Sequence, residues 1–341
     1  MTIRHLLVIA LIAIIFAPSA HAGQLPRPDR VVVVIEENSG YSQIMHMRNS
    51  NSYIHALARR GVLFTQSYGI THPSQPNYLA LFSGSTQGVS RNSCPHTFNN
   101  ENLASSLLAA GFSFASFSES LPAVGDLSCS SGAYQRKHNP AANWQGSRLP
   151  AGSNQRFADF PKDYSRLPTV SFVVPDQDND MHDGSFEAAD GWLKRHIEPY
   201  VDWAMKHNSL LILTWDEDNY QEGNHIVTIL VGPMVKTASS DQHIDHYNML
   251  RTLLDFYDLP AFGASRDAEA IKNIWVKRLP SAERAVSTGS RQAARSCIFG
   301  RCYFAAISFS YLACSCSLLS TCPGSLLMQS TGQTSTHCGV S

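Results

Sequence analysis

Ser74 is the residue of this sequence whose setting most directly suggests chemistry. It lies in the stretch THPSQPNYLALFSGS, residues 71–85, where a polar loop leads into an apolar segment. Pro76 suits the first turn of a helix, and the unpaired N–H groups at such a turn stabilise an alkoxide or a bound phosphate. A serine hydroxyl is a weak nucleophile that needs a base or a metal. From the loop alone, Ser74 reads as a helix cap more readily than as a nucleophile. Asn77 reads as a turn amide or as a donor to a phosphoryl oxygen.

Two pairs of oxygen-bearing side chains follow apolar runs elsewhere in the chain. Glu37 and Asn38 end the run VVVVIEEN, and Asp216 and Glu217 end the run SLLILTWDE. Buried together, such groups repel one another and lose hydration unless a cation lies between them. Oxygen ligands favour Ca²⁺, Mg²⁺ or Mn²⁺, and Zn²⁺ also accepts carboxylates. Each acid alone would be a solvated or helix-capping residue, whereas the four together predict a site for one divalent metal ion.

Three histidines lie beside segments that could belong to the same site. His182 ends the run PDQDNDMH, His225 precedes the apolar run IVTILVGP, and His138 lies in KHNP. We expect His182 or His225 to protonate a departing oxygen or to hold a phosphoryl oxygen, and His138 to contact the substrate. A structural role is the alternative for each of them. His72 is a weaker candidate, and His246 is expected to cap or pack a helix.

Strands that alternate with helices must position these residues. The apolar runs predict strands at residues 31–37, 62–69, 113–119, 169–176, 209–217 and 226–233. Helices are predicted at residues 52–61, from residue 76 onward, and at 102–111, 187–208 (broken near Pro199) and 245–260. This order predicts an α/β fold with a mostly parallel central sheet and helices on both faces. Ligands of such sheets bind at the carboxyl ends of the strands, where the acids and the Ser74 loop should converge. Residues 121–168 read as a long surface excursion.

The two ends of the chain differ from the patterned part. Residues 1–22 combine a basic start, a short apolar run and an Ala-His-Ala ending, which predicts a secretory signal peptide cleaved after Ala22. One folded domain, which holds the candidate site, is expected at residues 23–280. Residues 281–341 form a Ser- and Cys-rich, low-complexity tail that we expect to be poorly ordered. We therefore expect a secreted or periplasmic protein with no transmembrane span after cleavage.

Composition restricts the partners and supports a disulfide. The formal net charge of −1 gives no electrostatic basis for binding nucleic acid or an anionic membrane surface, and 43% hydrophobic residues support one sizeable core. Among the eight cysteines, Cys94 and Cys129 lie in the patterned part. Export would allow these two thiols to pair.

Taken in order, the segments IEENSGY, THPSQPNYLALFSGS, VVPDQDNDMHDGS, TWDED and NHIVTILVGP resemble a known family. It is the bacterial secreted acid phosphatase and phospholipase C phosphoesterase family of the alkaline phosphatase superfamily. The resemblance implies that Ser74 is the nucleophile and that one metal ion is held by the following residues: Glu37, Asn38, Ser74, Asp216 and Glu217. It also implies that Asn77 binds a phosphoryl oxygen, and it places His182 and His225 where two-metal relatives hold a second ion.

The expected function is therefore an exported, metal-dependent phosphoric ester hydrolase with a serine nucleophile. A phosphomonoesterase of the acid phosphatase type is the first choice, with phosphoinositides among its possible substrates. A phosphodiesterase of the phospholipase C type and a non-catalytic, secreted phosphate-ester-binding protein are the alternatives. A sulfatase is disfavoured because Gln-Pro-Asn follows Ser74, without the arginine of the pattern [CS]-x-P-x-R. A serine esterase is disfavoured because the Gly-x-Ser-x-Gly turn is absent around Ser74.

Overall fold

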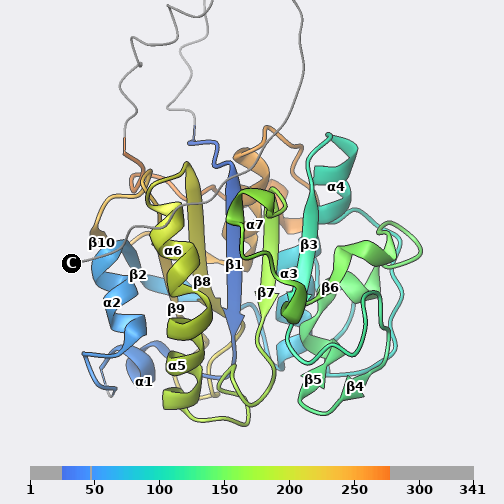
Figure 1. Ribbon diagram of the computed structural model, residues 1–341, viewed down its shortest axis with the longest axis horizontal. Helices are drawn as coiled ribbons and strands as arrows, with labels where there is room; N and C mark the ends of the chain where they lie inside the picture. Colours follow the sequence, from blue (N-terminus) through green and yellow to red (C-terminus); the bar gives the residue numbers. More distant parts are fainter. Residues whose placement is uncertain (1–24, 47, 277–341) are drawn as a thin grey trace, which may run out of the picture. The chain divides into compact units, whose positions relative to one another are not determined.

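A nine-stranded sheet forms the centre of the protein (Figure 1). The computed structural model describes residues 25–46 and 48–276; the predicted signal peptide and tail lie outside this part. The strand order is β10-β2-β9-β8-β1-β7-β3-β6, and β11 also pairs with β2. The strands are β1 (Arg30–Glu36), β2 (Val62–Tyr68), β3 (Phe114–Ser118), β6 (Asn154–Arg156), β7 (Val170–Val174), β8 (Ser209–Trp215), β9 (His225–Val231), β10 (Ala238–Ser240) and β11 (Ile244–Asp245).

All strand pairs of this sheet are parallel except those made by β9. Strand β9 runs antiparallel to both β2 and β8, so β2 and β8 still run in the same direction. The predicted fold class, a mostly parallel sheet, is confirmed. The carboxyl ends of β1, β2 and β8 consequently meet at one edge of the sheet, and the amino end of β9 lies at that edge as well.

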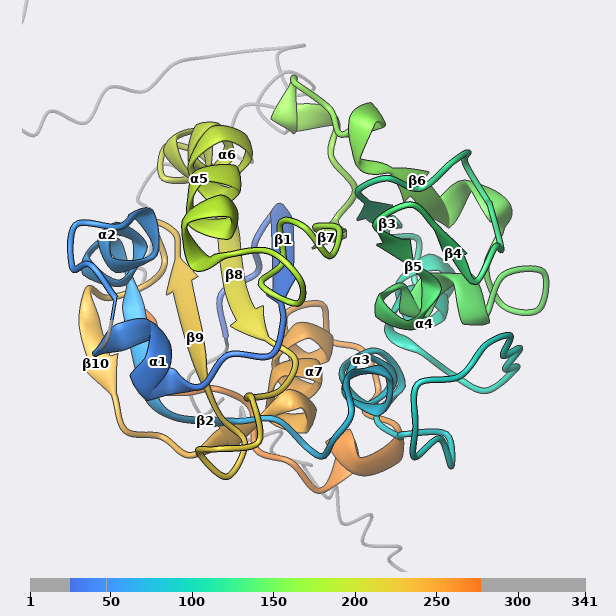
Figure 2. The same ribbon diagram turned by 90° about the horizontal axis from the view of Figure 1, so that it is seen from below.

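Helices cover both faces of the sheet (Figures 1 and 2). One face packs against α1 (Tyr41–Met45), α2 (Tyr53–Arg60), α5 (Phe186–His196) and α6 (Glu198–Ala204). The other face packs against α3 (Ser74–Ser83), α4 (Leu103–Ala109) and α7 (His246–Asp255). The two helical layers explain why the central strands are apolar throughout, because a sheet covered on both sides has no solvated face.

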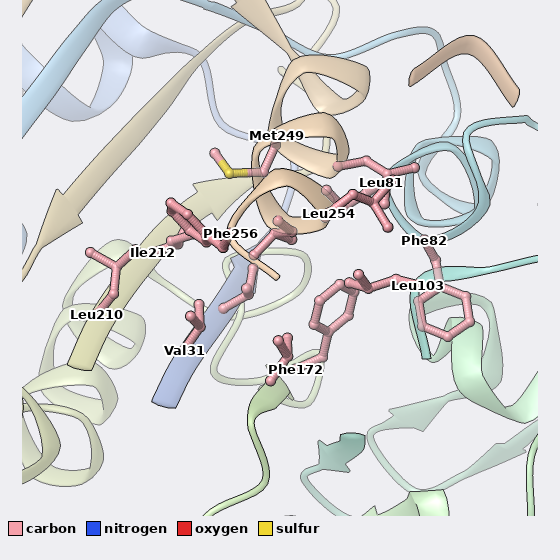
Figure 3. Packing of buried hydrophobic residues seen from close by; sticks show 14 of the residues in the cluster. Val31, Leu81, Phe82, Leu103, Phe172, Leu210, Ile212, Met249, Leu254 and Phe256 are labelled. Atoms are coloured by element: carbon pink, nitrogen blue, oxygen red, sulfur yellow. The ribbon is translucent and has the colours of Figure 1, made fainter. Parts of the chain in front are cut away.

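Strand β1 shows how this sequence divides between the two cores. Val32 and Val34 pack with the layer of α2, α5 and α6, whereas Val31, Val33 and Ile35 pack with the layer of α3 and α7. Figure 3 shows the second cluster, in which Val31 lies among residues of α7 and of the neighbouring strands. Residues on a strand alternate between the two faces of a sheet. Strand β1 is therefore packed on both faces, which fixes the position of its carboxyl end.

Most predicted elements are present with small shifts of their ends. Helix α3 begins at Ser74, two residues before Pro76, so the serine belongs to the helix itself. The predicted break near Pro199 is the junction at Ile197 between α5 and α6. The short helix α1 and the edge strands β10 and β11 were not predicted, because segments of two to five residues carry too little periodicity.

The predicted excursion at 121–168 is built from short elements. It contains the hairpin of β4 (Ser130–Ser131) and β5 (Tyr134–Gln135), the strand β6, and several 3₁₀-helices, among them η1 (Arg136–His138). Cys94 and Cys129 form the predicted disulfide bond. No helix among residues 25–46 and 48–276 is long and apolar enough to cross a membrane.

Candidate active site

The candidate site lies at the shared carboxyl edge of β1, β2 and β8. Glu37 directly follows β1, Asp216 and Glu217 directly follow β8, and Ser74 opens the helix after β2. All four side chains are almost completely buried. The parallel strands thus bring together residues that are separated by up to 180 positions in the sequence.

The Ser74 hydroxyl lies within hydrogen-bond distance of two carboxylates and can donate its one proton to either. Its Oγ lies 2.9 Å from Glu37 Oε2 and 2.9 Å from Glu217 Oε1. One turn later on the same helix face, the Tyr78 hydroxyl donates to Glu37 Oε1 at 2.7 Å. The hydroxyl therefore has a ready proton acceptor on each side, as a nucleophile requires.

The acids around Ser74 fit a divalent cation. One oxygen each of Glu37, Asp216 and Glu217 lies within 4.8 Å of the others. Asp216 Oδ2 is buried and has no hydrogen-bond partner among the described residues. Burial, with Glu37 and Glu217 as neighbours, raises the pKa of Asp216 well above its usual range. Burial and the Glu37 carboxylate raise the pKa of Glu217 to about 7. Crowded carboxylates of this kind call for a positive charge between them.

Asn38 contributes to this cluster through its backbone. Its N–H donates to Asp216 Oδ1 at 3.4 Å, and its φ of 50° places it in the left-handed region that asparagine tolerates. The turn at Asn38 therefore holds the end of β1 against Asp216. Ligation by its side-chain oxygen stays a prediction.

His138 reaches the cluster from the excursion. Its Nε2 lies 2.9 Å from Glu37 Oε1 and its Nδ1 lies 3.4 Å from Asp180 Oδ2, while its ring stacks on Tyr78. Both nitrogens are at ion-pair distance, although Nε2 lacks the angle of a hydrogen bond. Burial opposes the charge of this ring, but Glu37 and Asp180 outweigh it and raise the pKa of His138 to about 9. Burial likewise opposes the Glu37 charge, yet His138 lowers the pKa of Glu37 to about 2. Substrate contact by His138 stays a prediction.

His182 lies next to His138. The centroids of the two rings are 5.7 Å apart, and nitrogens of both rings lie within 4.8 Å of a Glu37 oxygen and of each other. His182 Nδ1 lies 2.7 Å from Asp183 Oδ1, and His182 Nε2 lies 3.0 Å from Lys137 Nζ. The structure thus brings His182 to the site, as predicted.

His225 has a different environment. Its ring is stacked between Tyr41 and Tyr68, and its Nε2 lies 3.0 Å from the carbonyl oxygen of Thr65. Within the described part of the chain, none of its contacts is with Ser74 or the acid cluster. The structure therefore does not bring His225 into contact with the acid cluster, and its role as a proton donor stays a prediction.

Asn77 is used within its own loop. Its Oδ1 accepts from the N–H groups of Ile70 and Thr71 at 2.8 and 3.1 Å, and its Nδ2 donates to the Thr71 carbonyl at 2.7 Å. These bonds are those of a turn amide, which is one of the two roles that the sequence left open for Asn77. Contact with a phosphoryl oxygen stays a prediction.

Several residues at the site were missed or rated low from the sequence. His72 Nδ1 lies 2.6 Å from Glu217 Oε2, and its Nε2 lies 3.1 Å from Asp218 Oδ1. Tyr220 stacks on the His72 ring at 3.9 Å. His246 Nε2 lies 2.7 Å from the Asp216 carbonyl. These residues fix the orientation of the acids, a role that partners of metal ligands commonly have.

Comparison with known proteins agrees with this geometry. The sequence model of the Phosphoesterase family matches residues 42–260. A phosphatidylinositol-3-phosphatase of Mycobacterium tuberculosis is 45% identical over 257 residues, which cover 74% of this chain and 85% of that protein. A probable acid phosphatase of Kluyveromyces lactis is 29% identical, and the match covers 69% of this chain and 59% of that protein.

Solved structures share the fold at low sequence identity. A Vibrio parahaemolyticus protein of the alkaline phosphatase superfamily is 12% identical with a TM-score of 0.50, over 69% of this chain and 67% of that one. A phosphonate monoester hydrolase of Silicibacter pomeroyi is 12% identical with a TM-score of 0.51, over 74% and 78% of the two chains. The chain therefore belongs to the phosphoesterase family and is a phosphoric ester hydrolase with the fold of the alkaline phosphatase superfamily.

Proposed function

We propose that this protein is an exported, metal-dependent phosphomonoesterase whose nucleophile is Ser74. The observation that carries the proposal is the position of Ser74 Oγ, 2.9 Å from an oxygen of Glu37 and 2.9 Å from an oxygen of Glu217. Unpaired Asp216 Oδ2 beside them supports a cation at the same point. Glu37, Asn38, Ser74, Asp216 and Glu217 would hold one divalent ion, which supplies charge that favours the serine alkoxide and the transferring phosphoryl group.

The residues of the chain then perform two displacements. Ser74 Oγ attacks phosphorus and its proton passes to one of the two carboxylates, while the ester P–O bond breaks and the alcohol takes up a proton. Of the two histidines predicted to give that proton, we retain His182, because it lies beside His138 in the cluster. Water next attacks phosphorus and gives a proton to His182, the Oγ–P bond breaks, and Ser74 recovers its proton from the carboxylate as phosphate leaves.

Phosphoinositide monoesters are the substrates we propose first. The relative from Mycobacterium tuberculosis, 45% identical, is named a phosphatidylinositol-3-phosphatase, and the fungal relatives are named acid phosphatases. Export is supported by the signal-like residues 1–22 and by the Cys94–Cys129 bond, since disulfides persist in oxidising compartments. Amino-terminal sequencing of protein recovered outside the cytoplasm should begin at Gly23.

Product analysis tests the proposed reaction. Purified protein with Mg²⁺, Mn²⁺, Ca²⁺ or Zn²⁺ is given phosphatidylinositol 3-phosphate and, in parallel, phosphatidylcholine. We expect inorganic phosphate from the first and no diacylglycerol from the second. Ser74→Ala should lower turnover on the order of a thousandfold or more with an unchanged circular dichroism spectrum. Release of diacylglycerol would support the phosphodiesterase alternative, and tight binding of the phosphoinositide without turnover would support the binding protein.

A further inference from the structure

Lys137 is a half-buried cation beside the acid cluster that the proposed mechanism does not use. It lies in η1 between Arg136 and His138. Its ammonium is one of the charges that lower the pKa of Glu37, which places it within electrostatic reach of the nucleophile. Among the described residues, its one polar contact is the 3.0 Å approach of Nζ to His182 Nε2.

The backbone that carries Lys137 is held firmly on both sides. Arg136 is buried, and its guanidinium donates to the carbonyls of Leu127 and His96 at 2.7 Å each. Its backbone N–H donates to the carbonyl of Cys129, a member of the disulfide. On the other side, His138 is fixed between Glu37 and Asp180. Lys137 therefore starts from a rigid base close to the reacting centre.

The contact with His182 orients both side chains. Lys137 Nζ lies 3.0 Å from His182 Nε2. On the other side of the ring, His182 Nδ1 lies 2.7 Å from Asp183 Oδ1 and 2.9 Å from Gln177 Nε2. Lys137 makes no ion pair with a carboxylate in the described part of the chain. Within the described residues, two of its N–H groups have no acceptor and are available to an anion.

Lys137 and a second metal ion compete for the same place. Glu37, His138 and His182 are spaced as ligands of an ion would be. However, His182 Nε2 already faces Lys137 Nζ at 3.0 Å, and His138 Nε2 already faces Glu37 at 2.9 Å. An ion bound there would have to displace the ammonium. The ammonium thus provides one positive charge at the point where an ion would provide two.

We propose that Lys137 binds a non-bridging oxygen of the substrate phosphoryl group and acts in place of a second metal ion. This inference rests on the proposed reaction at Ser74. A monoester dianion carries two charges over three non-bridging oxygens, whereas a diester carries one charge over two. A fixed ammonium favours the dianion, and lysine binds phosphate as a point charge. Lys137 is therefore a specificity residue that favours monoesters over diesters.

The test compares two substrates in wild type and three variants. The kcat/KM values for p-nitrophenyl phosphate and bis(p-nitrophenyl) phosphate are measured for wild type, Lys137→Gln and Lys137→Arg. Lys194→Gln removes the same charge from the exposed side of α5 and is the matched control. We expect Lys137→Gln to lower the monoester value roughly a hundredfold, the scale for removing one preorganised donor. The diester value should fall at least tenfold less, Lys137→Arg should restore part of the loss, and Lys194→Gln should change neither value.

Metal content and phosphate inhibition supply independent readings. We expect one equivalent of metal per wild-type chain, and inorganic phosphate should inhibit Lys137→Gln more weakly than wild type. Equal losses for both esters, unchanged kinetics, or two equivalents of metal in wild type would each overturn the inference. If Ser74→Ala kept its activity, the proposed reaction itself would fail. If Lys137→Gln left both kcat/KM values unchanged while Ser74→Ala abolished activity, only the proposed role of Lys137 would be wrong.

Discussion

At the scale of single residues, the charges around Ser74 determine how the site behaves. The carboxylates of Glu37, Asp216 and Glu217 lie close together. Ser74 Oγ is within hydrogen-bond distance of Glu37 and Glu217. Tyr78 and His138 share the remaining oxygen of Glu37. The acids of the cluster thus have different sets of partners, and their pKa values shift in different directions although they are neighbours in space.

The first prediction at this scale concerns metal removal and pH. In the metal-free protein the pKa of Glu217 is raised to about 7, above its value of about 4.5 in an unfolded chain. A group whose folded pKa is raised contributes stability below pH 4.5 that is lost as the pH rises through 7. We therefore expect the free energy of unfolding, measured by urea titration with a chelator present, to fall between pH 4.5 and 7.

Glu217→Gln is the control for this pH dependence, because glutamine does not titrate. Its metal-free unfolding free energy should vary less over the same interval. Added divalent metal should stabilise wild type more at pH 7 than at pH 4.5, since a metal ion binds carboxylates in their ionised form. A flat profile for metal-free wild type, or identical profiles for the two proteins, would contradict this description of Glu217.

The sequence was sufficient to select the residues of the candidate site that carry reactive or metal-binding groups. Ser74 and the two acid pairs were chosen for hydroxyl and carboxylate groups at strand ends, and the sheet brings them together. Lys137 was not chosen, because its partner is 45 positions away and no local pattern links them. Tyr78 was also missed, although its spacing of four residues from Ser74 on one helix face was a usable signal.

At the scale of elements, the loop between β8 and β9 holds the metal-site acids in place. Asp218 is fully buried at its start and accepts from the backbone N–H groups of Tyr220, Glu222 and Asn224 at 2.7, 2.6 and 3.1 Å. Its other contact is His72 Nε2, and His72 in turn contacts Glu217. Asp218 therefore links the fold of this loop to the orientation of Glu217.

Asp218→Ala is accordingly expected to damage stability and turnover together. Loss of the carboxylate leaves three backbone N–H groups without their acceptor, of which that of Asn224 is buried, and this should lower the free energy of unfolding by roughly 2–3 kcal/mol. Hydrolysis of p-nitrophenyl phosphate should fall as well, because His72 loses the group that orients it. Asp241→Ala, at an exposed site before β11, should stay within about 0.5 kcal/mol of wild type. A stable and fully active Asp218→Ala protein would rule out this linking role.

The elements themselves were largely predictable where the pattern was long. The runs of β1 and β8 are apolar on both faces because helices cover both, and this made them recognisable as central strands. The reversed direction of β9 could not be predicted, because a buried run of residues looks the same in either direction. His225 is the first residue of that strand. The antiparallel pairing of β9 with β2 sets it opposite Tyr68, on which its ring stacks, and Tyr41 of α1 stacks on the same ring.

At the scale of the whole described part, the disulfide joins two loops that support the site. Cys94 lies just after Asn92 and Ser93, which hydrogen-bond the backbone N–H and the side chain of Gln75 in α3. Cys129 accepts from the backbone of Arg136, next to Lys137 and His138. The disulfide therefore joins the loop that contacts Gln75 of helix α3 to the loop that contacts Arg136, next to Lys137 and His138.

Removing this bond should destabilise the protein and weaken catalysis. The Cys94→Ser, Cys129→Ser double variant opens a loop of 35 residues, which the loop-entropy relation values at roughly 3–4 kcal/mol of unfolding free energy. Its hydrolytic activity should fall because both supporting loops gain freedom. Wild type treated with reductant should approach the double variant, and the variant should not respond to reductant. Equal unfolding midpoints for oxidised wild type and the double variant would contradict this role.

The central claim is that phosphate passes through Ser74, and mass spectrometry of the acid-quenched enzyme tests it most directly. Metal-loaded protein is mixed with excess p-nitrophenyl phosphate, quenched within the first turnovers and digested. We expect one phosphoryl group on the peptide that contains Ser74, and none in a chelator-treated sample or in Ser74→Ala. A phosphoryl group on another residue, or steady turnover by Ser74→Ala, would contradict it.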